Sequence, residues 1–198
     1  MTVLAPASRP RPLPLLFAVY LVLVAWTVLW KLDVPQVGAG GQRVVKLVPF
    51  VATAHAGASE PVELALNLVF FLPFGVYLGL LAPSWPWWRV AGILAGASAL
   101  LEVAQYVLAV GSSDATDVVV NTAGGLAGLG AVVLARRSLR ARTAAVVTRW
   151  CAVGTVLALV ATGLFVASPV RLMGPPPGDV VVGCDDGAAS GHESPCRG

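Results

Sequence analysis

Charged residues are scarce in this chain, and that scarcity excludes most classes of soluble protein. Only 12% of its 198 residues are Asp, Glu, Lys or Arg, whereas 57% are hydrophobic. A soluble globular domain carries about 25% charged residues. The chain is therefore too apolar to contain a large soluble domain. Its net charge of +3 does not indicate nucleic-acid binding, because the basic residues are not interleaved with aromatic residues on a solvated segment.

Histidine and cysteine are also rare, with two and three residues respectively. A structural zinc site needs about four such ligands at a recognised spacing. Cys184 and Cys196, even together with His192, provide too few, so we expect no metal and no cofactor. If the C-terminal tail lies outside the cell, a disulfide between Cys184 and Cys196 is permitted, and two free thiols fit the sequence equally well.

Five hydrophobic runs are each long enough to cross a membrane. About 20 apolar residues span the roughly 30 Å hydrocarbon core of a bilayer. We therefore predict an all-α fold, a polytopic membrane helical bundle with a four-span core (13–135) and a fifth C-terminal span. The runs cover residues 13–32, 64–82, 87–110, 118–135 and 150–167.

The distribution of basic residues predicts the orientation of this bundle. Eight of the 13 basic residues lie before the first run, at the junction of the second and third runs, or between the fourth and fifth runs. In a chain with five spans, these three regions lie on the same side of the membrane. The basic side of a membrane protein is normally cytoplasmic. This predicts an N-terminus inside the cell and a C-terminus outside. The connecting segments are then a cytoplasmic N-terminal segment (1–12), a basic cytoplasmic loop (136–149) and an extracytoplasmic flexible tail (168–198).

Polar residues recur at helical spacing near the outer ends of the second, third and fourth runs. They are Glu63 and Asn67, then Ser98, Glu102 and Gln105, then Asp117 and Asn121. We expect these faces to converge on one polar site. Glu102 stands out, because a carboxylate within a span costs about 2.5–3.5 kcal/mol on insertion scales and usually has a partner or a function. The candidate binding residues are Asn67, Glu102, Gln105, Asp114, Asp117 and Asn121.

Structural roles remain open for several of these residues. Asp114 and Asp117 lie where a side-chain oxygen caps the start of a helix. Capping is the favoured interpretation for Asp114, and capping and function are weighted equally for Asp117. Asn67 and Asn121 can hydrogen-bond between helices, which is the favoured interpretation for Asn67. Glycines four residues apart predict close helix packing at three places: Gly75 and Gly79, Gly92 and Gly96, Gly124 and Gly128.

Four segments together resemble the VanZ-like family of bacterial membrane proteins: RVVKLVPF (43–50), NLVFFLPFGVYLG (67–79), LLEVAQYVL (100–108) and DATDVVVNTAGGLAG (114–128). The residues that carry the resemblance are Pro49, Phe50, Asn67, Phe71, Pro73, Gly75, Glu102, Gln105, Asp117, Asn121, Thr122 and Gly124. Family members often have an arginine just before the acidic turn, where this chain has Gly111, Ser112 and Ser113. Arg43 or Lys46 could pair with the acids instead.

The resemblance implies a place in the bacterial cytoplasmic membrane and an association with resistance to teicoplanin-type lipoglycopeptides. These drugs bind a cell-wall precursor outside the membrane and anchor through an acyl chain. The resemblance covers the chain from about residue 13 to 135, so the fifth run and the tail lie outside the resemblance.

Three functions are compatible with these residues. The favoured one is a non-catalytic envelope factor whose polar site binds a lipid head group, a lipid-linked cell-wall precursor or the lipoglycopeptide. The second is an intramembrane enzyme with Glu102 as general acid or base and Asp117 as its partner. The third is a small ion-coupled transporter that uses Glu102 as a protonation switch. The expected partners are membrane lipids and no nucleic acid, and the oligomeric state is left open.

Overall fold

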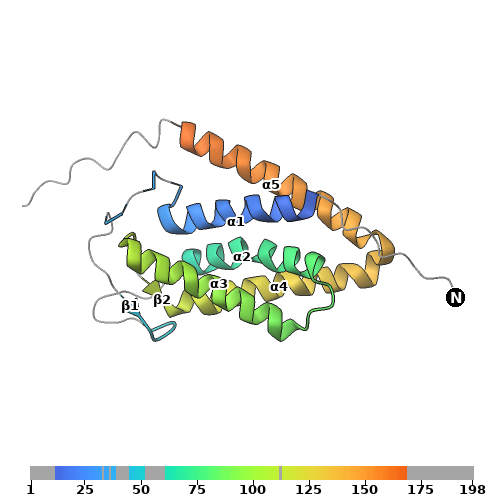
Figure 1. The fold of residues 1–198 in the computed structure, drawn as a ribbon, viewed down its shortest axis with the longest axis horizontal. Helices are drawn as coiled ribbons and strands as arrows, with labels where there is room; N and C mark the ends of the chain where they lie inside the picture. The colour runs from blue at the N-terminus through green and yellow to red at the C-terminus, as the bar shows by residue number, and fades with distance from the viewer. Residues whose placement is uncertain are drawn as a thin grey trace, which may run out of the picture.

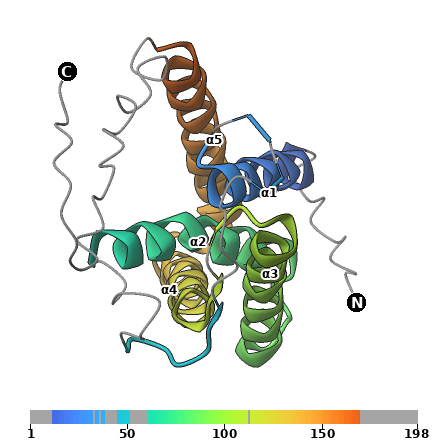
Figure 2. The ribbon, with the colours of Figure 1, turned by 90° about the vertical axis from the view of Figure 1, so that its left-hand side faces the viewer.

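A computed structural model of the chain describes residues 12–32, 34–35, 37–38, 45–51, 61–111 and 113–168. Most of the predicted N-terminal segment and of the tail lies outside these residues, together with Cys184, Cys196, His192 and Arg43. Of the five long helices, α2 lies at the centre of the bundle, between α1, α3 and α4 (Figure 2). The helices are α1 (Pro12–Trp30), α2 (Pro61–Leu81), α3 (Trp87–Leu108), α4 (Ala115–Leu139) and α5 (Thr143–Ala167), with a 3-10 turn, η1 (Arg140–Arg142).

Four helical stretches are long and apolar enough to cross a membrane. They are Pro12–Trp30, Pro61–Leu81, Trp87–Leu108 and Ala115–Ala167, the last a run of 53 residues. This last stretch contains α4, η1 and α5, and Figure 1 shows that it reverses direction at η1, so that α5 runs back along α1. The all-α fold and the four-span core followed by a long C-terminal helix agree with the prediction, and the chain is a multi-pass membrane protein.

Residues 136–149 are helical rather than a loop, which corrects the prediction. Helix α4 continues to Leu139 and α5 begins at Thr143, so only the three residues of η1 separate them. The arginines of this segment suggested a solvated loop, but arginine is also a good helix former. The reversal is fixed locally by Thr143, whose hydroxyl donates to the carbonyl of Arg140 at 2.8 Å. Arg136 donates to the carbonyl of Gly79 and so joins the end of α2 to α4.

Glycines bring the backbones of α2 and α4 into direct contact. The position that a Cβ would take on Gly124 is filled by the carbonyl of Leu68, and that on Gly128 by the carbonyl of Leu72. A Cβ on Gly75 would overlap the carbonyl of Gly125 in the same way. Because lipid tails are as apolar as leucine, helices in a bilayer associate through close packing of this kind and through hydrogen bonds.

The predicted glycine contact on α3 is wrong. Added Cβ atoms on Gly92 and Gly96 would meet no heavy atom within 4 Å. Four-residue glycine spacing is common in membrane helices, and it produces a contact only where a partner backbone lies opposite.

Aromatic rings join α1 to α2 on the other side of the central helix. The rings of Phe17 and Tyr77 are 5.2 Å apart and those of Tyr20 and Tyr77 are 5.5 Å apart. Tyr20 also donates its hydroxyl hydrogen to the carbonyl of Phe70 at 2.6 Å. That bond satisfies a polar group which would be costly to leave unpaired in an apolar interior.

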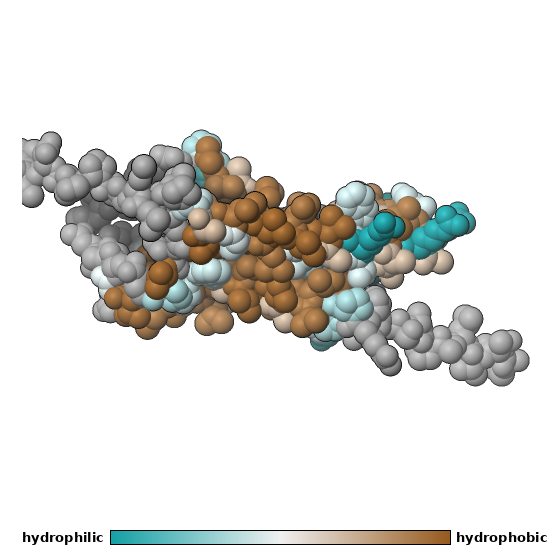
Figure 3. Space-filling model, turned by 90° about the horizontal axis from the view of Figure 1, so that it is seen from above, coloured by the Kyte–Doolittle hydropathy of each residue, from teal (hydrophilic) through white to brown (hydrophobic). Residues whose placement is uncertain are grey.

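The surface of the bundle is hydrophobic around its middle. Figure 3 shows a brown belt across the helices, with hydrophilic residues at the end where α4 meets α5. Side chains such as Leu15, Leu100 and Leu164 are more than 65% exposed. Such a continuous apolar surface would be a liability in water, and it suits contact with lipid tails.

The glycine contact between α2 and α4 predicts a position-specific effect of adding one methyl group. Gly75→Ala should lower the free energy of unfolding by about 1–3 kcal/mol, because the methyl group forces two backbones apart. Gly92→Ala, the matched control on α3, should be neutral or stabilising, since alanine favours helix by about 1 kcal/mol over glycine. Thermal unfolding of the two purified variants in detergent measures the difference. Equal effects would contradict the packing argument.

Candidate polar site at one end of the bundle

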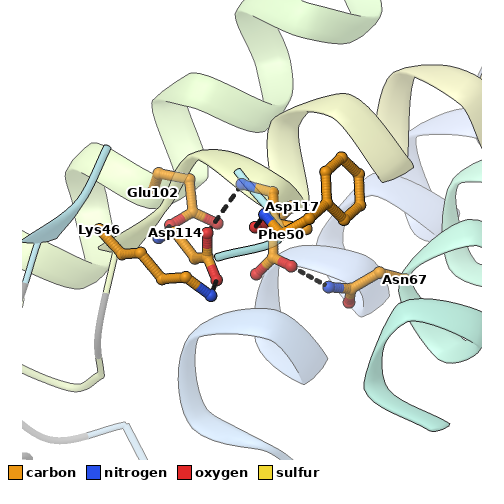
Figure 4. Close-up of polar contacts among 7 residues, drawn as sticks. Lys46, Phe50, Asn67, Glu102, Asp114 and Asp117 are labelled. Atoms are coloured by element: carbon orange, nitrogen blue, oxygen red, sulfur yellow. Dashed lines mark hydrogen bonds and ion pairs between the residues drawn. The ribbon is translucent and has the colours of Figure 1, made fainter. Parts of the chain in front are cut away.

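Polar side chains from five separate segments meet at the end of the bundle opposite η1 (Figures 1 and 4). We call Lys46, Asn67, Glu102, Asp114 and Asp117 the polar cluster. Asn67 comes from the first turns of α2, Glu102 from the last turns of α3, and Asp117 from the first turn of α4. The loop before α2 supplies Lys46, and the short connection between α3 and α4 supplies Asp114.

Two short strands hold this loop against the bundle. Strand β1 (Val45–Lys46) pairs in parallel with β2 (Ser113–Asp114), with Lys46 opposite Asp114. A few residues further on, the backbone amide of Phe50 donates to the hydroxyl of Thr116 at 3.0 Å. Residues 45–51 are thereby fixed across the start of α4.

Asp114 is the most connected member of the polar cluster. One carboxylate oxygen accepts from the amide of Thr116 at 2.8 Å, which makes Asp114 the N-cap of α4. The other oxygen pairs with the ammonium of Lys46 at 2.9 Å. The amide of Asp114 in turn donates to Glu102 at 2.8 Å. The capping interpretation of Asp114 is confirmed, and the residue also carries an ion pair.

Lys46 is the cation that the structure places against Asp114. Its side chain is only 2% exposed, and the ion pair with Asp114 offsets the cost of burying its charge. Of the two cations considered from the sequence, Lys46 contacts an acid, and Arg43 lies outside the described residues.

Asp117 does not cap α4 but reaches across to α2. Its carboxylate accepts from the side-chain amide of Asn67 at 2.7 Å. This bond places the Asn67 amide between two helices, in agreement with the interhelical interpretation of that residue. Glu102 is buried, with 6% of its surface exposed, and lies beside Asp114 and Asp117 in Figure 4.

Asn121 and Gln105 lie outside the polar cluster. Asn121 is one turn deeper along α4, where its amide donates to the buried hydroxyl of Ser98 on α3 at 2.8 Å. Gln105 faces α1, and its amide donates to the carbonyl of Val28 at 3.1 Å. The expected single site therefore separates into the polar cluster and two interhelical contacts. Spacing along one helix gives the face of a residue but not the neighbour that it meets.

Two contributors were not identified from the sequence. Thr116 is fully buried and fixes Phe50, although the only sequence signal was its place beside a helix cap. The backbone pairing of residues 45–46 with 113–114 had no signal at all, since two residues are too few for a strand pattern.

The polar cluster is acidic overall, with three carboxyl groups and one ammonium. Carboxylate oxygens accept hydrogen bonds from hydroxyl, amide and ammonium groups, so the cluster suits a polar ligand rich in donors. In the described part of the chain, no three His, Cys, Asp or Glu side chains gather closely enough to hold a metal ion.

The Lys46–Asp114 pair should stabilise the loop through charge compensation. Lys46→Met removes the ammonium that pairs with Asp114 and should lower the free energy of unfolding by about 3 kcal/mol. Asp114→Asn keeps an N-cap oxygen, because asparagine caps as well as aspartate. The double variant should therefore lose clearly less stability than the two single losses combined. Thermal unfolding in detergent of wild type, the two single variants and the double variant completes this double-mutant cycle. Additive losses of stability would contradict direct pairing.

Comparison with known proteins agrees with the sequence resemblance. The family model VanZ/LLP1 matches residues 17–136, which include the whole polar cluster. Protein VanZ of Enterococcus faecium is 34% identical over 116 residues, which are 58% of this chain and 69% of that protein. No solved structure matches the chain. Because the family model covers more than half of the chain, the protein belongs to the VanZ-like family.

Proposed function

We propose that this protein acts in the bacterial cell envelope and lowers susceptibility to teicoplanin-type lipoglycopeptides. The polar cluster would bind the polar part of a lipid-linked cell-wall precursor or of the drug itself. The observation that carries this proposal is the position of the cluster: all five residues lie inside the family match and gather at one end of the bundle. A ligand anchored in the membrane presents its polar part near the membrane surface, where the end of the bundle lies.

The arrangement of charges supports an outward-facing cluster in the cytoplasmic membrane. Arg136, Arg137, Arg140 and Arg142 lie at or beside η1, the end of the bundle opposite β1 and β2 (Figure 1). Basic residues favour the cytoplasmic side. The polar cluster would then face the exterior, where lipoglycopeptides and their lipid-linked targets meet the bilayer.

The contacts within the cluster favour binding over catalysis. Glu102 accepts from the amide of Asp114, and Asp117 accepts from Asn67, so both candidate catalytic carboxyl groups take part in contacts that hold the segments together. The described spans contain no histidine that could serve as a base. An intramembrane enzyme with Glu102 as acid or base and Asp117 as partner is the alternative, and a single substitution distinguishes the two.

Teicoplanin susceptibility of a sensitive bacterial host tests the proposal. Wild-type protein should raise the minimal inhibitory concentration above that of an empty vector, at matched membrane levels. Asp117→Ala should return the minimal inhibitory concentration close to the vector value, because the ligand would lose a hydrogen bond to a charged carboxylate. Such a loss costs about 1.5–3 kcal/mol, or more than tenfold in the affinity for the ligand. Glu102→Gln should retain most of the protection, since an amide oxygen can still accept from Asp114.

Glu63→Gln is the matched control, because Glu63 is an exposed acid in the first turn of α2, at the same end of the bundle. It should protect as wild type does. Complete loss of protection with Glu102→Gln, at normal membrane levels, would favour proton transfer and the enzyme. Absence of protection by the wild-type protein would overturn the proposal.

A further inference from the structure

A long apolar groove lies on the side of the bundle away from the polar cluster, between α1, α2 and α5. It has a volume of about 580 Å³, within the range of roughly 300–1,000 Å³ that is usual for small-ligand sites. Its wall on α5 runs from Val147 to Thr162, a rise of about 22 Å along the helix. The groove thus extends through much of the hydrocarbon core, which is about 30 Å thick.

The lining offers carbon atoms rather than polar groups. None of the described lining residues is charged. The hydroxyl of Tyr20 is bonded to the carbonyl of Phe70, and that of Thr27 to the carbonyl of Leu23. Water needs two or more polar partners to remain in such a place, so the groove favours a hydrocarbon occupant.

The groove is continuous with the lipid-facing surface of the bundle. Its lining residues Val69, Leu72 and Trp150 are themselves exposed, Trp150 to 71%. A lipid tail can therefore enter sideways from the bilayer without crossing a polar surface. Dividing the volume by the length of the α5 wall gives a mean cross-section of roughly 26 Å², well below the roughly 80–110 Å² of a helix 10–12 Å in diameter with its side chains.

A hydrogen bond between the two walls sets the distance of α5 from α2 across the groove. Tyr77 and Thr155 share a hydrogen bond of 3.1 Å across the groove. Both residues line it, and both are buried. Atoms that line an empty groove have no neighbours on one side and lose dispersion contacts. A chain of methylene groups in the groove would restore those contacts.

From these features we propose that the groove binds one acyl chain of a membrane phospholipid, which fastens α5 to the helices of the core. The wall contributed by α5 lies beyond residue 136, where the family match ends. The site is separate from the polar cluster, and its occupation does not depend on any role in drug resistance.

Photolabelling in vesicles without drug tests this proposal. The full-length protein is reconstituted in phosphatidylglycerol and phosphatidylcholine that contain a phospholipid with a diazirine on its acyl chain. After illumination, labelled residues are located by mass spectrometry and normalised to the exposed surface of α3 at Leu100 and Val103. Labels should concentrate on groove residues of α1, α2 and α5.

Two glycines of α5 provide matched variants. Gly154 lines the groove and Gly163 does not, and an added Cβ meets no heavy atom within 4 Å at either position. Gly154→Phe should reduce groove labelling about tenfold by occupying the space, whereas Gly163→Phe should leave it unchanged. Gly154→Leu, a smaller replacement, should give an intermediate reduction and serves if the phenylalanine variant folds poorly.

Several results would overturn the proposal. Groove labelling that equals labelling of α3, or that persists in both Gly154 variants, would mean ordinary contact with surrounding lipid. A stable dimer in the same vesicles, with no lipid labelling of the groove, would assign the groove to a second chain. Loss of labelling on addition of teicoplanin, without any displacement by unlabelled phospholipid, would assign it to the acyl chain of the drug.

Discussion

The direct backbone contact between α2 and α4 is the constraint on which the polar cluster depends. Gly124 lies against the carbonyl of Leu68, the residue after Asn67, and Asp117 is two turns before Gly124 on the same helix. Any side chain at this contact would separate the two helices. The bond of 2.7 Å between Asn67 and Asp117 would then be broken. The glycines therefore determine whether two polar groups near the end of the bundle can satisfy one another, a requirement that is strict where water is scarce.

The loop at residues 45–51 also pairs polar groups, at a place outside the membrane-spanning helices. It brings a buried ammonium to Asp114 and a backbone amide to Thr116, so that the start of α4 is neutralised and capped at once. Asp114 joins these contacts to Glu102 on α3. The polar cluster is thus a bonded network around the start of α4, in which the loop and α3 bond to Asp114 and α2 bonds to Asp117. Such a network keeps its shape without a ligand, which suits a binding site that is formed in advance.

Much of the bundle could be predicted from the sequence, because the runs of apolar residues are long and the charges between them are few. Helix α4 extended beyond its predicted end because arginines that suggest a loop are equally compatible with helix. Of the three glycine pairs, those on α2 and α4 form contacts and the pair on α3 does not, since spacing does not reveal what lies opposite. The meeting of Asn67 with Asp117 followed from the pattern of polar faces, whereas the turn of Gln105 toward α1 did not. The parallel pairing of β1 with β2 depends on two residues per strand, too short for any periodic signal.

The boundary of the family match divides the molecule into parts with different physical roles. Residues 17–136 contain the glycine contact and the polar cluster, so the features that demand specific residues fall inside the match. Helix α5 lies outside it and is joined to α2 by the hydrogen bond between Tyr77 and Thr155 and by apolar contacts around the groove. In a bilayer such a helix gains nothing from leaving lipid for protein unless the packing is close. A lipid chain in the groove would supply that packing, and α5 would then be held to the core by the membrane itself.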